Sequence, residues 1–356
     1  MFEWLRNLFP KKQKLGLLPL PPDERDFDLG ALGWGEYTPK NTSVVIESSF
    51  PVRNQLFNTC TFNSRVVAKE RDEGVMLSVP FLVKIAKEWG LITRDGFANL
   101  RASELVVQKV GVCTDDLLSE SDNLPWDEYS KNNVSELQKD NALEHRSSTF
   151  WAVRNRYELW KALDEGHTVR MGSVWSNNTG KLAPYILDFS TGAVVGGHAY
   201  LVIGYDRNYN GQDVFVVQNS FGPNWGNKGR MYIKVKDFEY WAAKYGAFTD
   251  LDMPKDMSKM FNQYNGKLLK ETGSVDVYVV KSGKKWLFPD EATLYSHGHL
   301  DEQIVDDVSN FLKEVPLGGT LNFWEGKNVE TIKALILRAP HIKTLFSKYF
   351  SELFVN

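Results

Sequence analysis

Two apolar runs joined by a short polar segment constrain the fold of this chain more than any other feature. The runs are GHAYLVIGYD at 197–206 and VVQNSFGPNWG at 216–226. Both are rich in Val, Ile and Tyr and stop at Gly, Asp or Asn, which predicts two buried strands paired as a hairpin. Pairing would bring His198 beside Asn219. Because polar groups in an apolar setting cost stability unless they are satisfied, we expect this pair to serve a function as well as the fold.

The natural partner of this pair lies far upstream, at Cys60. From Cys60 onward, apolar residues recur at helical spacing up to Gly74, which predicts a helix over residues 60–74. A cysteine at a helix N-terminus is placed where the macrodipole stabilises a thiolate, so we expect a lowered pKa for this thiol. A thiol, an imidazole and an amide that orients the imidazole together make a cysteine nucleophile site.

The remaining elements indicate an α+β fold with two segregated halves, because helices come first and antiparallel strands follow. A cleft between the halves would place Cys60 on one wall and His198 on the other. The predicted elements, in chain order, are helices 78–90 and 100–110, a polar loop over 114–148, a helix at 157–166, and strands at 169–175 and 229–235.

The length of 356 residues predicts more than one domain. Residues 1–50 are punctuated by Pro and Gly and are expected to form an extended N-terminal arm, before a main domain at 51–255. Residues 256–356 are expected to form a small α+β accessory domain, with a hairpin at 277–288 that turns at Ser282-Gly283. Its last stretch, 342–354, has apolar residues at helical spacing. That helix would pack on its own sheet or offer an aromatic stripe to a partner protein.

Composition excludes several classes of function. A net charge of −3 and a pI near 6.1 give no basic surface for nucleic acid. Two cysteines, of which Cys60 is expected to be reactive and Cys113 buried and inert, exclude a disulfide-stapled scaffold. The sequence contains no run of 18 or more apolar residues, so it predicts no membrane span. Residues 1–9 lack the apolar core of a secretory signal and would form either a short amphipathic helix or a frayed terminus.

We expect no metal and no cofactor. His297 and His299 flank a glycine, but two histidines without a cysteine or an acid at ligand spacing are typical of an exposed turn. The sequence also lacks a phosphate-binding loop of the GxxxxGK[ST] type.

Several motifs together resemble the papain-like cysteine peptidases, in the bacterial and phage type that lacks a long inhibitory propeptide. The matching blocks are PDERDF at 22–27, PVRNQ at 51–55, LSxxFL at 77–82, GVC at 111–113, GHA at 197–199 and NSFGxxWGxxG at 219–229. His198 follows Cys60 by 138 positions (198 − 60), within the spacing usual for that family. The resemblance covers about residues 17–250.

The resemblance implies a papain-like two-lobed fold, with one helical lobe and one lobe built on an antiparallel sheet or barrel. It implies that Cys60 is the nucleophile of an acyl-enzyme and that His198 is first base and then acid. Asn219 would orient the imidazole, Trp225 would shield that contact from water, and Gly197 would be a supporting residue next to His198.

Some positions depart from the family pattern. The oxyanion-hole Gln of the family precedes its Cys by six positions, whereas here Gln55 precedes Cys60 by five (60 − 55) and Asn54 holds the sixth. We predict Gln55 as the donor, with Asn54 as the fallback, since either amide can donate. Phe57 stands where the family has an extra cysteine, so that disulfide is missing. Thr61 and Phe221 replace the usual aromatic residue after Cys and the usual Trp after Asn-Ser.

The C-terminal region resembles a small module of bacterial surface and phage tail proteins. The blocks are KWLFPD at 285–290, LYSHG at 294–298 and VPLGG at 315–319. That resemblance would place the chain on a cell surface or in a phage virion. With no secretory signal, the cytoplasm or a virion is the expected location.

The sequence therefore predicts a cysteine-type endopeptidase that acts on a peptide or protein substrate. One alternative is a papain-fold structural or binding component of a larger assembly, such as a virion, with little or no turnover. Another is a cell-wall peptide hydrolase, although the block at 219–229 speaks against an unrelated Cys–His fold. Fold-level analogy leaves the side-chain preference open.

Overall fold

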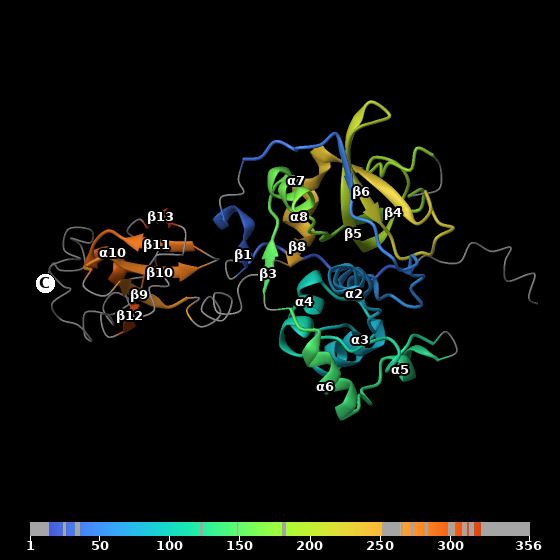
Figure 1. Cartoon of the computed structure of the whole chain (residues 1–356), viewed down its shortest axis with the longest axis horizontal. Coiled ribbons are helices and arrows are strands. Elements are labelled where there is room, and N and C mark those ends of the chain that lie inside the picture. Colours follow the sequence, from blue (N-terminus) through green and yellow to red (C-terminus); the bar gives the residue numbers. More distant parts are fainter. Residues whose placement is uncertain are drawn as a thin grey trace, which may run out of the picture. The chain divides into compact units, whose positions relative to one another are not determined.

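A computed structural model describes most of the chain and divides it into two compact units (Figure 1). The first contains the described residues of 1–22 and 33–252, and the second those of 23–32 and 253–356. The predicted boundaries at residues 50 and 255 stay predictions. The described residues are 14–23, 26–32, 36–121, 124–147, 149–179, 183–250, 264, 266–271, 274–281, 284–297, 303–307, 312 and 317–321.

The first part of the first unit is helical, and its helix ends follow the signals in the sequence. The first helix starts at Cys60 and stops at Gly74, whose φ of 69° takes it out of the helix. The next is capped by Ser78, whose side chain accepts from the Phe81 N–H. The helices share one apolar core. They are α2 (Cys60–Glu73), α3 (Val79–Glu88), α4 (Leu100–Lys109), α5 (Trp126–Tyr129) and α6 (Glu136–Glu144).

The prediction of a loop over 114–148 is wrong for two stretches, because α5 and α6 lie within it. In α6 only Ala142 is buried, so the helix has no apolar stripe that periodicity could reveal. A local signal was present instead. Ser135 and Gln138 form a capping box in which each side chain accepts from the other residue's backbone N–H.

The second part of the first unit is an antiparallel sheet, in which β3, β8, β4, β5, β6 and β7 are neighbours in that order. β5 is the longest strand and pairs with β4, β6 and β2, with Leu201 opposite Gln218 in the hairpin. The predicted order of helices before antiparallel strands is confirmed. The strands are β2 (Ser43–Val45), β3 (Phe150–Ala152), β4 (Val169–Ser176), β5 (Val194–Tyr209), β6 (Gln212–Gln218), β7 (Arg230–Lys234) and β8 (Ala247–Asp250).

Three further elements belong to this half: α7 (Arg156–Asp164), the 3-10 turn η2 (Val235–Asp237) and α8 (Phe238–Tyr245). In Figure 1, α7 and α8 lie with the strands, whereas α3 to α6 lie on the other side of α2. α2 packs against β5 and also against α3 and α4, so it joins the two halves. Its first residue is Cys60, which puts the thiol at this junction.

The second unit holds β1 (Phe27–Asp28), η1 (Leu29–Leu32) and a five-stranded mixed sheet in the order β12, β9, β10, β11, β13. Residues 277–281 and 284–288 pair antiparallel as predicted, while the turn at Ser282-Gly283 lies outside the described residues. The predicted helix at 342–354 also lies outside them, as do residues 1–9, for which the sequence predicts a helix or a frayed terminus. The elements after the first two are β9 (Leu268–Glu271), β10 (Val277–Lys281), β11 (Lys284–Phe288), α10 (Glu291–Ser296), β12 (Ile304–Asp307) and β13 (Leu317–Thr320).

Within the described part of the chain, none of the helices has both the length and the apolar composition to cross a membrane.

Candidate active site

His198 and Asn219 meet at the β5–β6 hairpin through a hydrogen bond. His198 Nε2 and Asn219 Oδ1 are 2.7 Å apart, and Oδ1 also accepts from the Ser220 N–H at 2.7 Å. The second bond fixes which end of the amide faces the ring, so Nε2 carries the proton and donates. Nδ1 is left with its lone pair. It is buried and has no hydrogen-bond partner among the described residues.

The Cys60 thiol lies beside the same strand. It faces the backbone N–H groups of Ala199, the residue after His198, and of Gly16 and Thr61. These groups favour a thiolate, but Cys60 is 0% exposed and burial raises the pKa of its thiol above the ordinary value. The expected lowering of this pKa is therefore wrong for this state of the site. Desolvation outweighs the N–H groups at the helix start.

The imidazole is equally enclosed. His198 is 0% exposed, and burial lowers its pKa to about 4 although the bond to Asn219 acts in the opposite direction. A thiol with a raised pKa beside an imidazole with a lowered one is a neutral pair at neutral pH. Burial therefore favours the uncharged forms of both the Cys60 thiol and the His198 imidazole in this enclosed site.

The segment that encloses the site is residues 14–18, which we call the cover. The Ala98 N–H donates to the Gly16 carbonyl at 2.8 Å, and the Leu18 N–H donates to the Ala98 carbonyl at 2.9 Å. From the other half, the Gly197 carbonyl accepts from the Leu17 N–H at 3.1 Å. The cover is therefore tied by its backbone to both halves of the first unit.

Glycines let the cover come this close. A Cβ on Gly16 would lie 1.9 Å from the Asn58 carbonyl oxygen, and one on Gly172 would lie 2.0 Å from Leu17 Cδ2. A Cβ on Gly197 would lie 2.5 Å from the Leu17 carbonyl oxygen. Leu17 fills the space so completely that it is 3% exposed. The predicted supporting residue Gly197 thus makes room for the cover.

The two candidate oxyanion donors are in different positions. Gln55 is buried, and its Nε2 donates to the Lys14 carbonyl and to the Phe57 carbonyl, both at 2.8 Å. Its Oε1 accepts from the Ser220 hydroxyl, which holds the amide in place. Asn54 is exposed, and its backbone bridges Phe221. Of the two, Gln55 is the amide that points into the enclosed site.

Aromatic rings surround the imidazole. The Trp175 and Phe221 ring centroids lie 4.5 Å and 4.6 Å from the His198 ring centroid. Trp225 packs on Trp175 and Phe221, at 5.8 Å and 5.6 Å. The ring predicted to shield the His–Asn contact therefore sits behind two others.

Sequence reasoning missed the cover and Trp175. Trp175 is the last predicted residue of the strand 169–175, and β5 register sets Gly196 opposite it, close to His198. A tryptophan at that end of the strand was a usable signal. The cover offers a weaker one, a single glycine between two leucines in LGL at 15–17.

Other candidate residues stand apart from this site. Cys113 is buried, and burial raises the pKa of its thiol to about 12. The His297 ring packs edge-on against Phe288, and His299 lies outside the described residues. Among the described residues, no group of three or more His, Cys, Asp or Glu side chains is arranged to hold a metal ion.

Residues 57–246 match the family described as "Papain family cysteine protease", which is more than half of the chain. The chain belongs to the papain family of cysteine proteases. This match confirms the predicted family and the predicted class of cysteine peptidase.

One curated relative is "Cathepsin B-like CP2" of Giardia intestinalis, 36% identical over 61 residues, which span 17% of this chain and 20% of the relative. Among solved structures, xylellain, a cysteine protease from Xylella fastidiosa, has a TM-score of 0.56 and 21% identity. That match covers 69% of this chain and all of xylellain, and it confirms the papain-like α+β fold. Digestive procathepsin L 3 of Tenebrio molitor matches with a TM-score of 0.48 and 16% identity, over 67% of this chain and 75% of that one.

Proposed function

We propose that this chain cleaves peptide bonds through an acyl-enzyme on Cys60, and that the described state is a latent form with its cleft occupied by the cover. The observation that carries the proposal is the His198–Asn219 bond at 2.7 Å, next in the chain to the Ala199 N–H that faces the Cys60 thiol, with backbone bonds from both halves holding the cover over a buried thiol.

The chemistry follows from the roles that these atoms can take. His198 Nδ1 accepts the thiol proton, and the Cys60 thiolate attacks the carbonyl carbon of a peptide bond. Gln55 Nε2 and the Cys60 backbone N–H stabilise the oxyanion. The imidazolium then protonates the leaving amine as the C–N bond breaks. Water hydrolyses the thioester with His198 as base, which releases the acid and restores the thiol.

The neutral state of the pair explains why the cover matters. A sulfur that is 0% exposed cannot meet a peptide, and a desolvated pair favours its uncharged form. When the cover leaves, water returns to His198, and the helix N-terminus and N–H groups act on a solvated thiol. Both changes favour the thiolate–imidazolium pair that attacks.

The test is intact-mass labelling with a small epoxide thiol trap near neutral pH. A valine at position 16 cannot fit against the Asn58 carbonyl, so Gly16→Val should expel the cover and speed labelling by at least about tenfold over wild type. Adding Cys60→Ala to Gly16→Val should abolish the adduct, and adding His198→Ala should slow it. The matched control is Leu18→Val, since Leu18 is 37% exposed and should label like wild type.

A folded Gly16→Val chain that forms no adduct, or labelling that is indifferent to His198→Ala, would contradict the proposal. The papain-fold structural or binding component would then be the better description, because a permanently sealed cleft is what such a component would show. Incubating the Gly16→Val chain with purified peptidoglycan, beside a protein substrate, separates the cell-wall hydrolase from a general peptidase. Location in a virion stays a prediction.

A further inference from the structure

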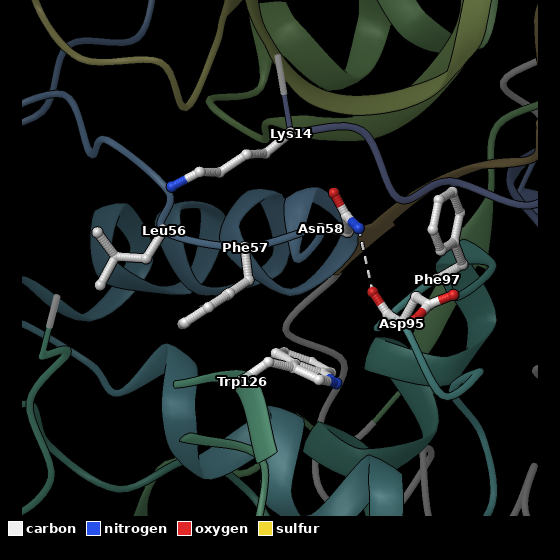
Figure 2. A pocket seen from close by; sticks show the side chains of 7 residues that line it. All are labelled: Lys14, Leu56, Phe57, Asn58, Asp95, Phe97 and Trp126. Atoms are coloured by element: carbon white, nitrogen blue, oxygen red, sulfur yellow. Dashed lines mark hydrogen bonds between the residues drawn. The ribbon is translucent and has the colours of Figure 1, made fainter. Parts of the chain in front are cut away.

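A cavity of about 440 Å³ opens next to the nucleophile (Figure 2). One wall is the loop before Cys60, and another is the loop before Ala98, which holds the cover. Figure 2 shows Lys14 along one side and Trp126 on the opposite side, with Phe57 projecting between them. The lining residues are Lys14, Leu56, Phe57, Asn58, Asp95, Phe97 and Trp126.

Lys14 shows how a side chain enters this cavity. Its carbonyl accepts from Gln55 Nε2 at 2.8 Å, and its ammonium lies 5.9 Å from the centroid of the Phe57 ring. A residue whose carbonyl accepts a hydrogen bond from the Gln55 amide, as that of Lys14 does, can therefore place its side chain in this cavity. Under the proposed function, that residue is the one whose carbonyl the Cys60 thiolate attacks.

The cavity walls are suited to a cation. The Phe57 and Trp126 centroids are 5.3 Å apart, and both rings pack on Tyr129. The Trp126 indole N–H donates to the Arg94 carbonyl at 2.6 Å, which holds that ring in place. Aromatic faces attract ammonium and guanidinium groups through their quadrupoles. A side chain with a long apolar stem and a charged end fits both the rings and the solvent-facing mouth.

The carboxylates around the cavity also favour a positively charged side chain. Asp95 lines it, and the Glu120 carboxylate acts electrostatically on Lys14. Glu120 also accepts from the Tyr129 hydroxyl at 2.9 Å. Cations that do not belong to the cover also lie in this region. The Lys87 ammonium lies 5.9 Å from the Trp126 ring centroid and donates to the Ser130 hydroxyl at 2.6 Å, and Arg53 Nη1 lies 3.9 Å from the Glu120 carboxylate.

We propose that this cavity selects a lysine or arginine at the residue whose carbonyl is attacked, and that Phe57 and Trp126 determine the selection. The inference rests on the proposed function. Lys14 is the internal example of the preferred side chain. Phe57 stands where related peptidases have a cysteine, so the aromatic wall that Phe57 forms is a departure of this chain from the family pattern.

The test compares peptidyl ketone thiol traps that differ only at the residue next to the reactive ketone: lysine, norleucine or glutamate. Norleucine keeps the stem of lysine without its charge. On the Gly16→Val chain, the lysine trap should label Cys60 roughly five- to thirtyfold faster than the norleucine trap, and glutamate should be slowest. Phe57→Leu and Trp126→Leu should each bring the lysine-to-norleucine ratio toward one.

Tyr240→Leu is the matched control, since Tyr240 is a 63% exposed aromatic residue that does not line the cavity, and it should leave the ratio unchanged. Each ratio is measured within one variant, so it does not depend on how much of that variant is folded. Equal rates for lysine and norleucine on the Gly16→Val chain would overturn the inference, as would a ratio that survives both aromatic substitutions. The small epoxide is run in parallel. If it too fails to label Cys60, the proposed function is what has failed.

Discussion

Two buried clusters of titratable side chains join the helical half to the sheet half, and they treat charge in opposite ways. One is the active site. The other, which we call the ionic ring, alternates two arginines and two acids, Arg65, Glu104, Arg170 and Asp250, from α2, α4, β4 and β8. Arg65 Nε lies 3.0 Å from Glu104 and its Nη1 lies 2.9 Å from Asp250. Arg170 contacts the same two acids at 2.5 Å and 3.3 Å.

In the ionic ring each charged group lies against a partner of opposite sign, which favours its ionised form. Burial opposes ionisation, yet Arg170 and Arg65 hold the pKa of Asp250 below its ordinary value, and Asp250 and Glu104 raise that of Arg170. Burial does raise the pKa of Glu104, against the pull of both guanidiniums. In the candidate active site, the described groups that oppose burial are hydrogen-bonding partners rather than ions of opposite charge, so burial keeps the thiol and the imidazole neutral. Burial alone does not decide ionisation; the partner does.

Of the changes predicted here, breaking the ionic ring should lower the free energy of unfolding the most. Arg65→Met leaves two acids with one guanidinium in a buried site, which should lower the free energy of unfolding by about 3–5 kcal/mol, measured by urea denaturation at neutral pH. Lys139→Met, which removes an exposed pair with Glu136, is the control and should leave the free energy of unfolding close to that of wild type. A loss near that of the control would mean that the ring contributes little.

Acid should open the cover. The pKa of His198 is about 4 when covered, and an exposed imidazole titrates near 6.5, so the open state binds a proton that the covered state lacks between these values. The covered state keeps its full advantage above pH 6.5 and loses about 3 kcal/mol as pH falls to 4. The readout is hydrogen-exchange protection of the Leu17 and Leu18 amides, corrected for intrinsic rates. His198→Gln should remove the dependence, and pH-independent protection in wild type would contradict it.

Removing the amide from the active site should have the smallest effect on stability. Asn219→Ala leaves the His198 Nε2–H and the Ser220 N–H without their acceptor, at a cost of about 1–3 kcal/mol in unfolding free energy. Asn219→Asp sharpens the comparison, because it gives the imidazole the anionic partner that the arginines of the ring have. The His198 pKa, followed by NMR titration, should then rise above about 4. An unchanged value would mean that the partner's charge does not matter here.

The fold and the reactive groups were predictable where local chemistry and tertiary structure agree. The helix from Cys60 to Gly74, the Ser78 cap and the hairpin that pairs His198 with Asn219 each leave a pattern within a few residues. The ionic ring leaves none, since Arg65 and Arg170 look like ordinary charges in their own elements. The sign of the Cys60 pKa shift also escaped prediction, because it depends on residues 14–18, which touch the thiol only after folding.

The cover carries a consequence for the order of events during synthesis. The cover precedes both of its backbone partners, Ala98 and Gly197, and the second of these lies in a strand that is completed only after most of the first unit has been made. The seal is therefore among the last contacts to close, because it requires the helical half and the sheet half to be in place. We therefore expect each newly made chain to pass through an interval in which Cys60 has been made and is not yet covered.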